Sequence, residues 1–328
     1  MKKMLTAALA AMMTVSLAAC GGSSSQQTTA APATEAATEA ATEAATEAAK
    51  EETEAATETA AETEAETEAA AETEAAAEEA SELTTVNDGK LTVAMSPDFA
   101  PYEFYAIGED GTPTLAGFDV SLANYIADHL GLELEIIPMD FDGTIMELSQ
   151  HNVDLGISGY SPSPDRAEVM DFSEIYYTGG QSFVCLQANK DKFASLEDTN
   201  KADLTVGAQV GSIQADLAKE NSPEADLIQM AKVTDLIAEV LNGKMDGAYI
   251  ETLVAESYAK NYPDLCVVLP VPYDAEGSVV GVNKGNEALL AGVNEAIKQC
   301  IDEGLMEDWV AEANELATGD IIEGMIEE

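Results

Sequence analysis

The chain has 328 residues and a formal net charge of −48, from 62 acidic and 14 basic residues. From residue 83 onward there are 45 acidic and 11 basic residues, so the region with a globular composition is itself strongly acidic. Such a surface repels phosphate backbones and argues against nucleic acid as a partner. The length suits one large domain or two lobes with separate cores.

The start of the chain has the pattern of an export signal. Lys2 and Lys3 precede an apolar run at residues 4–19, which is too short for an ordinary transmembrane helix. The run ends in Leu-Ala-Ala-Cys-Gly at residues 17–21, which resembles the bacterial lipobox. This resemblance implies that residues 1–19 are removed and that Cys20 carries a lipid anchor outside the cytoplasmic membrane. The alternative is an ordinary secretory signal that happens to contain a cysteine.

Residues 20–83 are interpreted as the lipidated cysteine followed by a low-complexity linker. Thr-Glu-Ala-Ala repeats with a period of four at residues 34–49 and continues irregularly. Alanine is the only apolar residue in this repeat, so the segment cannot bury a core. Glutamates four residues apart oppose helix formation, although both alanine and glutamate favour it. We expect a self-repelling spacer.

From Lys90 onward, the apolar pattern predicts alternating strands and helices. A first series of strand, helix, strand, helix and strand occupies residues 91–95, 117–130, 132–139, 143–150 and 153–158. A second series, again beginning with a strand, occupies residues 204–208, 212–220, 227–230, 233–242, 247–251, 252–261 and 266–271. A strand at 277–283 and a helix at 286–303 follow. Alternation of this kind implies parallel sheets covered by helices, and two series imply two lobes.

The turns after the predicted strands are the places where a ligand site is expected, because open α/β sheets bind ligands beyond the carboxyl ends of their strands. These turns carry polar or aromatic side chains. One of them contains Arg166, the only arginine of the chain. Arginine binds carboxylates with a planar two-pronged geometry that lysine does not reproduce. The sequence therefore points to Arg166 as a carboxylate-binding residue.

Several short motifs follow one another in a specific order: Pro-Tyr-Glu-Phe at 101–104, Gly-Phe-Asp-Val at 117–120, Phe-Asp-Gly at 141–143, Val-Asp-Leu at 153–155, Ser-Gly at 158–159, Pro-Asp-Arg at 164–166, Asp-Phe-Ser at 171–173 and Tyr-Tyr at 176–177. Over about residues 88–318 the chain resembles the polar amino acid solute-binding proteins of ABC importers. The resemblance implies an α/β, two-lobed periplasmic-binding-protein fold. Each lobe would hold a mainly parallel sheet flanked by helices, and two hinge strands would join the lobes. Lobe 1 would comprise residues 84–186 and 272–328, and lobe 2 residues 187–271.

The resemblance also implies how the two charged ends of an amino acid are held. Arg166 would grip the α-carboxylate, assisted by Gly159 and Ser161. Ser212, at a predicted helix N-terminus in the second lobe, would donate to the same carboxylate. Glu251 stands where the family usually has aspartate, and it would pair with the α-ammonium group.

Four further positions would surround the ligand's side chain. Phe99 and Phe141 match positions whose rings sandwich that side chain in the family. Members that grip a polar or cationic side chain often have aspartate at the position of Ser96, so the serine weakens the case for a lysine or arginine ligand. A small polar or neutral amino acid is the preferred ligand, and a cationic one is the second choice. Tyr160 stands where many members have a smaller residue and would narrow the pocket.

The expected function is therefore an extracytoplasmic binding lipoprotein, not an enzyme. By hinge closure it would capture a free L-amino acid, preferably polar or neutral, and deliver it to the permease and ATPase subunits. We expect a monomer that needs no cofactor or metal. Two alternatives stay open: a sensory amino acid binding module, and a dehydratase-like enzyme on the same fold. The sequence offers the enzyme no nucleophile–base pair, metal cluster or phosphate loop.

The remaining cysteines are Cys185, Cys266 and Cys300, and their spacing matches no zinc or redox motif. We interpret them as small buried hydrophobic residues. A single disulfide such as Cys185–Cys266 is the alternative, and the sequence does not decide between the two.

Overall fold

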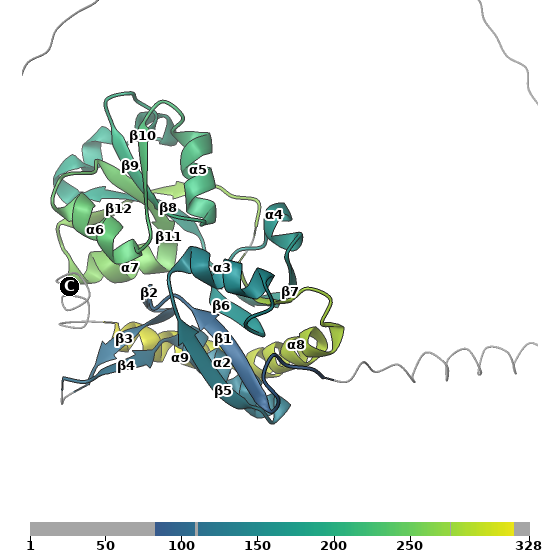
Figure 1. Ribbon diagram of the computed structural model, residues 1–328. Helices are drawn as coiled ribbons and strands as arrows, with labels where there is room; N and C mark the ends of the chain where they lie inside the picture. The colour runs from purple at the N-terminus through teal and green to yellow at the C-terminus, as the bar shows by residue number, and fades with distance from the viewer. Residues whose placement is uncertain (1–82, 109–110, 276, 318–328) are drawn as a thin grey trace, which may run out of the picture. The chain divides into compact units, whose positions relative to one another are not determined.

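The computed structural model describes residues 83–108, 111–275 and 277–317, all within one compact unit of the chain. Cys20, the predicted signal peptide and most of the predicted linker lie outside the described residues. Two five-stranded sheets and one three-stranded sheet form the framework, and helices pack against the two larger sheets (Figure 1). Among the described helices, none is both long and apolar enough to cross a membrane.

The first sheet has the strand order β5-β1-β6-β13-β7. In chain order its strands are β1 (Lys90–Met95), β5 (Glu133–Pro138), β6 (Leu155–Tyr160), β7 (Met170–Tyr177) and β13 (Ser278–Asn283). Alternate residues of β1 face two different cores: Val93 packs with helix residues such as Leu122, whereas Ala94 packs with Phe141. The helices of this lobe are α2 (Phe118–Leu130), α3 (Phe141–Ser149), α4 (Pro164–Ala167), α8 (Glu287–Asp302) and α9 (Leu305–Leu316).

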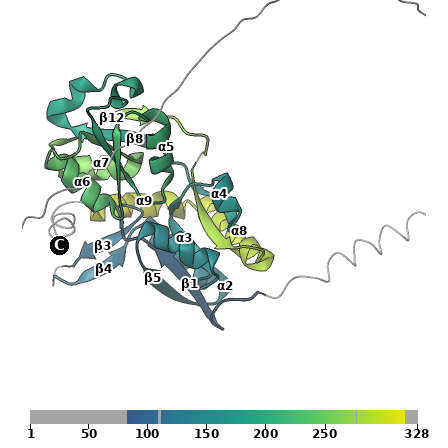
Figure 2. The ribbon, with the colours of Figure 1, turned by 45° about the horizontal axis from the view of Figure 1, so that its top comes forward.

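The second sheet has the order β10-β9-β11-β8-β12. Its strands are β8 (Gln181–Leu186), β9 (Thr205–Gln209), β10 (Asp226–Met230), β11 (Gly247–Glu251) and β12 (Leu265–Val271). The helices α5 (Ile213–Asn221), α6 (Val233–Leu241) and α7 (Thr252–Asn261) surround it (Figure 2). The short 3₁₀ helices η1 (Gln187–Lys192) and η2 (Leu196–Thr199) lie between β8 and β9.

The predicted two-lobed α/β class is confirmed, and both large sheets prove to be mixed. In each sheet four strands run in the same direction, and one strand, β13 in the first sheet and β8 in the second, runs antiparallel to both of its neighbours. The chain crosses between the sheets at residues 178–180 and 272–277. Each crossing leads into the strand that runs opposite to the others, β8 after the first crossing and β13 after the second. Because β8 pairs with β11 and β12, residues 181–186 belong to the second sheet, whereas the sequence analysis placed the lobe boundary after residue 186. Only the short 3₁₀ helices η1 and η2 follow β8, so no α-helix marks it as the start of a new series.

A small sheet after β1 was not predicted from the sequence. It has the order β2 (Asp98–Phe99), β3 (Glu103–Ile107) and β4 (Pro113–Ala116). The backbone of Gly117 then turns sharply into α2 with a φ of 119°. A Cβ at this position would lie 2.1 Å from the carbonyl oxygen of Tyr102, so only glycine lets the chain pass there. This close approach places Tyr102 against α2.

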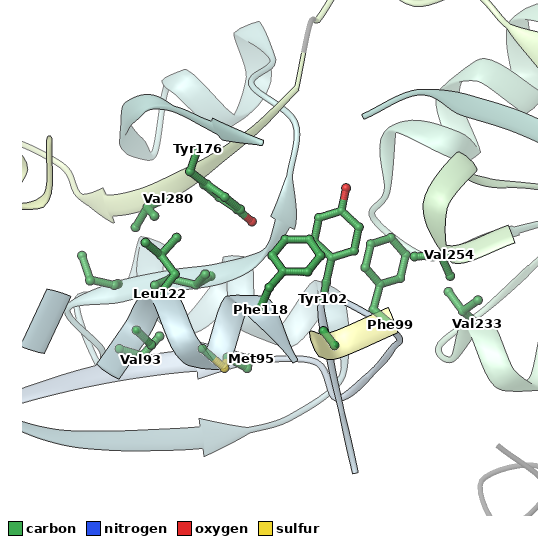
Figure 3. Close-up of a cluster of buried hydrophobic side chains, with 14 of the residues drawn as sticks. Val93, Met95, Phe99, Tyr102, Phe118, Leu122, Tyr176, Val233, Val254 and Val280 are labelled. Atoms are coloured by element: carbon green, nitrogen blue, oxygen red, sulfur yellow. The ribbon is translucent and has the colours of Figure 1, made fainter. Parts of the chain in front are cut away.

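One apolar core continues from the first lobe into the second. Figure 3 shows Phe99 between Tyr102 on one side and Val233 and Val254 of the second lobe on the other. The ring of Tyr102 packs on Phe118, with the ring centroids 4.3 Å apart. The segment after β1 thus lies where the two lobes meet, and its side chains are the first to examine for a site.

Candidate functional site

Arg166 is held at the boundary between the lobes and is only 7 % exposed. Its Nη1 donates to the carbonyl oxygen of Ser161 at 2.7 Å, and its Nη2 donates to that of Gly211 at 3.0 Å. Gly211 lies in the turn between β9 and α5, so this second bond joins the lobes. The guanidinium carbon lies 5.4 Å from the ring centroid of Phe141 and 5.6 Å from that of Tyr160. These two bonds use two of five N–H donors and leave three for an incoming group.

Arg166 also lines a cavity of about 410 Å³. One wall comes from the first lobe and the other from the turn before α5 and from α5 itself, and the further lining residues are Asp142, Ile145, Ser163, Pro164, Asp165, Val169, Gly211, Ile213 and Asp216. Among the described residues, the ion pairs leave Arg166 without an acidic partner. Burial lowers the pKa of Arg166 from its ordinary value. An anionic group brought to this guanidinium would therefore be bound strongly.

Glu251 ends β11 and caps the N-terminus of α7. Its Oε2 accepts from the backbone N–H of Val254 at 2.9 Å, whereas its buried Oε1 has no hydrogen-bond partner. Burial raises the pKa of Glu251 to about 7. A Cβ on Gly179 would lie 2.5 Å from this Oε1 and 3.1 Å from the hydroxyl oxygen of Tyr102, which is also buried without a partner. The carboxyl group of Glu251 and the phenol of Tyr102 thus lie together beside the backbone of Gly179.

The end of β6 depends on Gly159. The residue has a φ of 57°, in the left-handed region, and its N–H donates to Oδ2 of Asp119 at 3.0 Å. A Cβ on Gly159 would lie 2.8 Å from the ring of Phe99. Glycine therefore allows the ring of Phe99 to lie directly against the backbone at the end of β6. The hydrogen bond to Asp119 fixes this backbone in place.

Four buried carboxyl groups surround this region: Asp98, Glu103, Asp119 and Glu251 are between 0 % and 6 % exposed. None of them takes part in an ion pair among the described residues. Burial raises the pKa of Asp98 to about 6 and that of Asp119 to about 7, and it raises the pKa of Glu103 well above its usual range. Asp119 and Glu103 share a hydrogen bond, which requires that one of them keeps its proton, whereas Oε1 of Glu251 has no hydrogen-bond partner. The region therefore holds one free acceptor and a proton-sharing pair of carboxyl groups.

Asp98 ties the first lobe to the second, and the sequence analysis did not identify it. Its Oδ1 accepts from the hydroxyl of Ser96 at 2.8 Å, and its Oδ2 accepts from the backbone N–H of Val233 at the N-terminus of α6. The side-chain amide of Gln209 lies 3.4 Å from the same Oδ2, and the hydroxyl of Tyr258 donates to the backbone oxygen of Asp98 at 3.3 Å. The signal in the sequence was an acidic residue in the turn after the first strand, two positions beyond Ser96.

Several predicted residues already have partners within the protein. The hydroxyl of Ser212 caps α5 by accepting from the N–H of Ala215 and donates to the carbonyl oxygen of Gln209. The hydroxyl of Tyr160 donates to Thr144 at 2.5 Å. Phe99 and Phe141 lie in different apolar clusters, so the structure does not bring these two rings together. Ligand contact by the nine predicted residues stays a prediction: Ser96, Phe99, Phe141, Gly159, Tyr160, Ser161, Arg166, Ser212 and Glu251.

Two α/β lobes joined by two crossings, with buried charged groups at their boundary, define the class of two-lobed solute-binding proteins. The chain belongs to the bacterial extracellular solute-binding proteins, family 3, whose family model matches residues 91–312. The family agrees with the predicted location outside the cytoplasm.

The chain is 37 % identical over 223 residues to the arginine-binding extracellular protein ArtP of Bacillus subtilis, covering 66 % of this chain and 83 % of that protein. In structure it is similar to the amino acid ABC transporter substrate-binding protein AbpA of Streptococcus pneumoniae bound to L-arginine. The TM-score is 0.68 at 32 % identity, covering 70 % of this chain and 97 % of the other.

A more distant similarity leads to an enzyme, the cyclohexadienyl dehydratase of Pseudomonas aeruginosa. The identity is 25 % over 221 residues, covering 67 % of this chain and 78 % of that protein. The family and the more similar relatives are solute-binding proteins, and they confirm the prediction that the chain is a binding protein and not an enzyme.

Proposed function

We propose that the protein is a lipid-anchored receptor that binds a free cationic L-amino acid between its lobes and delivers it to the permease of an ABC importer. Arginine is the first candidate, because relatives such as ArtP are named for it. The observation that carries the proposal is a set of four buried carboxyl groups at the lobe boundary, against one guanidinium. Burial raises the pKa of all four, and a bound cation would favour their ionised forms.

The imbalance distinguishes between classes of amino acid. The three unused donors of Arg166 suit an α-carboxylate, and the unpartnered Oε1 of Glu251 suits an α-ammonium group. A neutral amino acid would make only these two contacts. The other carboxyl groups would then be buried without a cation, which is costly in free energy unless they stay protonated. A cationic side chain would compensate them.

The buried carboxyl groups favour a cationic ligand, which was the second choice from the sequence, over a polar or neutral one. The preference for a polar or neutral ligand rested on Ser96, which stands where members of the family that grip a polar or cationic side chain often have aspartate. In the structure the hydroxyl of Ser96 donates to Asp98, so a buried carboxyl group is present two residues further on. This turn therefore contains a carboxyl group, which joins the two lobes through the N-terminus of α6 and adds negative charge near the site when it is ionised.

The anchor and the delivery step rest on separate grounds. The anchor rests on the Leu-Ala-Ala-Cys-Gly sequence that ends at residue 21, with Cys20 as the lipidated residue. Delivery to permease and ATPase subunits rests on the family to which residues 91–312 belong. We propose that the acidic linker between the two lets the receptor move between ligand capture and docking at the membrane.

A thermal-shift screen of the ligand-free protein against the twenty amino acids, L-ornithine and L-citrulline tests the proposal. A ligand at 100 times its Kd adds about 2.7 kcal/mol to the free energy of unfolding, which is readily measured. We expect the largest shift from L-arginine. L-Citrulline is the matched control, because it has nearly the same shape but a neutral urea in place of the guanidinium.

Two results would contradict different parts of the proposal. A larger shift from L-citrulline or L-glutamine than from L-arginine would refute the cationic ligand and leave the amino acid receptor standing. No shift from any of the amino acids would refute the receptor itself.

A further inference from the structure

Cys185 and Cys266 lie directly opposite each other on two antiparallel strands. The register of β8 and β12 pairs them with no residue between. Directly opposite residues project from the same face of a sheet, and their Cα atoms are about 4.5–5.5 Å apart. Disulfides span Cα separations of about 4.4–6.8 Å, so the strand geometry suits a covalent bond between the two.

The third described cysteine has no such partner. Cys300 is buried in α8, in the other lobe, where its Sγ donates to the carbonyl oxygen of Ile297 at 3.2 Å. In the structure the opposed pair are thiols whose only hydrogen bonds are long ones to adjacent carbonyl oxygens. Sγ of Cys185 donates to Leu186 at 3.3 Å, and Sγ of Cys266 donates to Val267 at 3.6 Å. Little is lost when these weak bonds are replaced.

We propose that Cys185 and Cys266 form a cross-strand disulfide in the exported protein. Of the pairings that the sequence leaves open, the strand register selects this one. The family to which the chain belongs is extracellular, and disulfides persist in such oxidising surroundings. The disulfide does not depend on which ligand the protein binds.

The oxidant is a small-molecule disulfide, RSSR. Cys266 is partly exposed, whereas Cys185 is buried and its pKa is raised by burial to about 12, so Cys266 attacks first. Attack by its thiolate forms a mixed disulfide and releases one RS⁻. The thiolate of Cys185 then displaces the second RS⁻ and closes the Cys185–Cys266 bond. Two electrons pass from the cysteines to RSSR, and the two thiol protons leave with two molecules of RSH.

The position of the bond suggests what it does. β12 is an edge strand with β8 as its only neighbour in the sheet, and its register shifts between Val267 and Leu269. The crossings join these strands at Gln181 and Val271, and the two cysteines lie at the other end of the strand pair. A disulfide would therefore hold the interrupted edge strand to the sheet at the end away from the crossings.

The disulfide would close a loop over residues 186–265. For a loop of this length we expect an increase in Tm of about 5–15 °C. Ligand binding should change little, because Cys185 pairs with Gly247 at the opposite end of β11 from Glu251.

Peptide mapping tests the proposal on the full-length protein recovered from outside the cytoplasm. The sample is alkylated while denatured and is then digested with trypsin without reduction. Cleavage after Arg166, Lys190, Lys260, Lys284 and Lys298 places the cysteines in the separate peptides 167–190, 261–284 and 299–328. We expect the first two as one linked species, two hydrogen atoms lighter than their sum, and the third alkylated. Reduction should separate the linked species.

Two further comparisons keep the test decisive. Incubation with oxidised glutathione that still leaves all three peptides alkylated, or a link that includes residues 299–328, would overturn the proposal. The Cys266→Ser variant should lose the link and show the Tm of the reduced wild-type protein. Cys300→Ser is the matched control and should keep both the link and the higher Tm. Equal Tm values for the oxidised and reduced wild-type proteins would overturn the structural role.

Discussion

At the scale of single residues, the site consists of charged groups that the protein has buried and left partly unpartnered. Arg166 donates two hydrogen bonds to carbonyl oxygens, and one oxygen of Glu251 accepts a hydrogen bond at a helix N-terminus. Each therefore has a fixed orientation and a remaining capacity to bind. This is what an amino acid with two opposite charges requires, since each of its ends finds a group already held in place.

Replacing Arg166 should abolish high-affinity binding. Arg166→Ala removes the partner of the α-carboxylate, and Arg166→Lys supplies the charge without the planar fork. We expect L-arginine affinity to fall by a factor on the order of 100 or more in the alanine variant, and substantially in the lysine variant. Isothermal titration calorimetry measures this. Lys90→Ala removes a surface ion pair with Glu135 and should leave affinity unchanged. Wild-type affinity in the Arg166→Lys variant would show that the α-carboxylate is not bound by the two-pronged geometry of the guanidinium.

At the scale of secondary-structure elements, the small sheet after β1 and the helix α6 meet through Asp98. A carboxylate at a helix N-terminus is stabilised by the unpaired N–H groups and by the helix dipole. In this protein the carboxylate and the helix belong to different lobes. The contact therefore favours closure of the lobes and contributes to the affinity for any ligand that requires the closed form.

Asp98→Asn should weaken this contact and lower the affinity for every ligand by a similar factor, about five- to tenfold. The affinities for L-arginine and L-lysine are compared by calorimetry. Asp235→Asn is the control, because Asp235 is an exposed acid in the first turn of the same helix. A loss confined to L-arginine would show instead that Asp98 grips the guanidinium directly.

At the scale of the whole molecule, carboxyl groups from both lobes meet at one boundary. Asp98, Glu103 and Asp119 come from the first lobe and Glu251 from the second. The acidic surface, with a formal net charge of −48 for the chain, adds a negative field that draws cations and repels anions. Capture of a cationic ligand thus agrees with both the local and the overall charge.

The affinity for L-arginine should depend on pH. Without ligand, burial raises the pKa of Asp98 to about 6 and that of Glu251 to about 7, so both bind protons more readily than free carboxyl groups. A bound cation favours their ionised forms and expels the protons. Affinity should therefore rise from about pH 5 to about pH 8, above which both groups are ionised even without ligand, and then level off.

Calorimetry in buffers of different ionisation enthalpy counts the protons released on binding. Glu251→Gln has one titrating group fewer and should show a slope of log affinity against pH that is lower by as much as one. An affinity that stays constant or falls over this range would contradict the role of these carboxyl groups.

The strands and helices with clear periodicity were predictable from the sequence. The strands at residues 91–95 and 247–251 and the helix at 252–261 appear in the structure as β1, β11 and α7. β2, β3 and β4 were missed because they are only two to five residues long and lie in a segment without periodic apolar residues. The last helix, α9, was also not predicted.

The sequence by itself determined the two-lobed class, and its single arginine with the surrounding motifs determined the family. These features are local, because each depends on spacing along the chain. Only the tertiary structure decided that Asp98 meets Val233, 135 positions away, and that Cys185 lies opposite Cys266. The reason is physical: burial, strand register and contact between lobes arise from segments far apart in the sequence, and they decide which charges are left without partners.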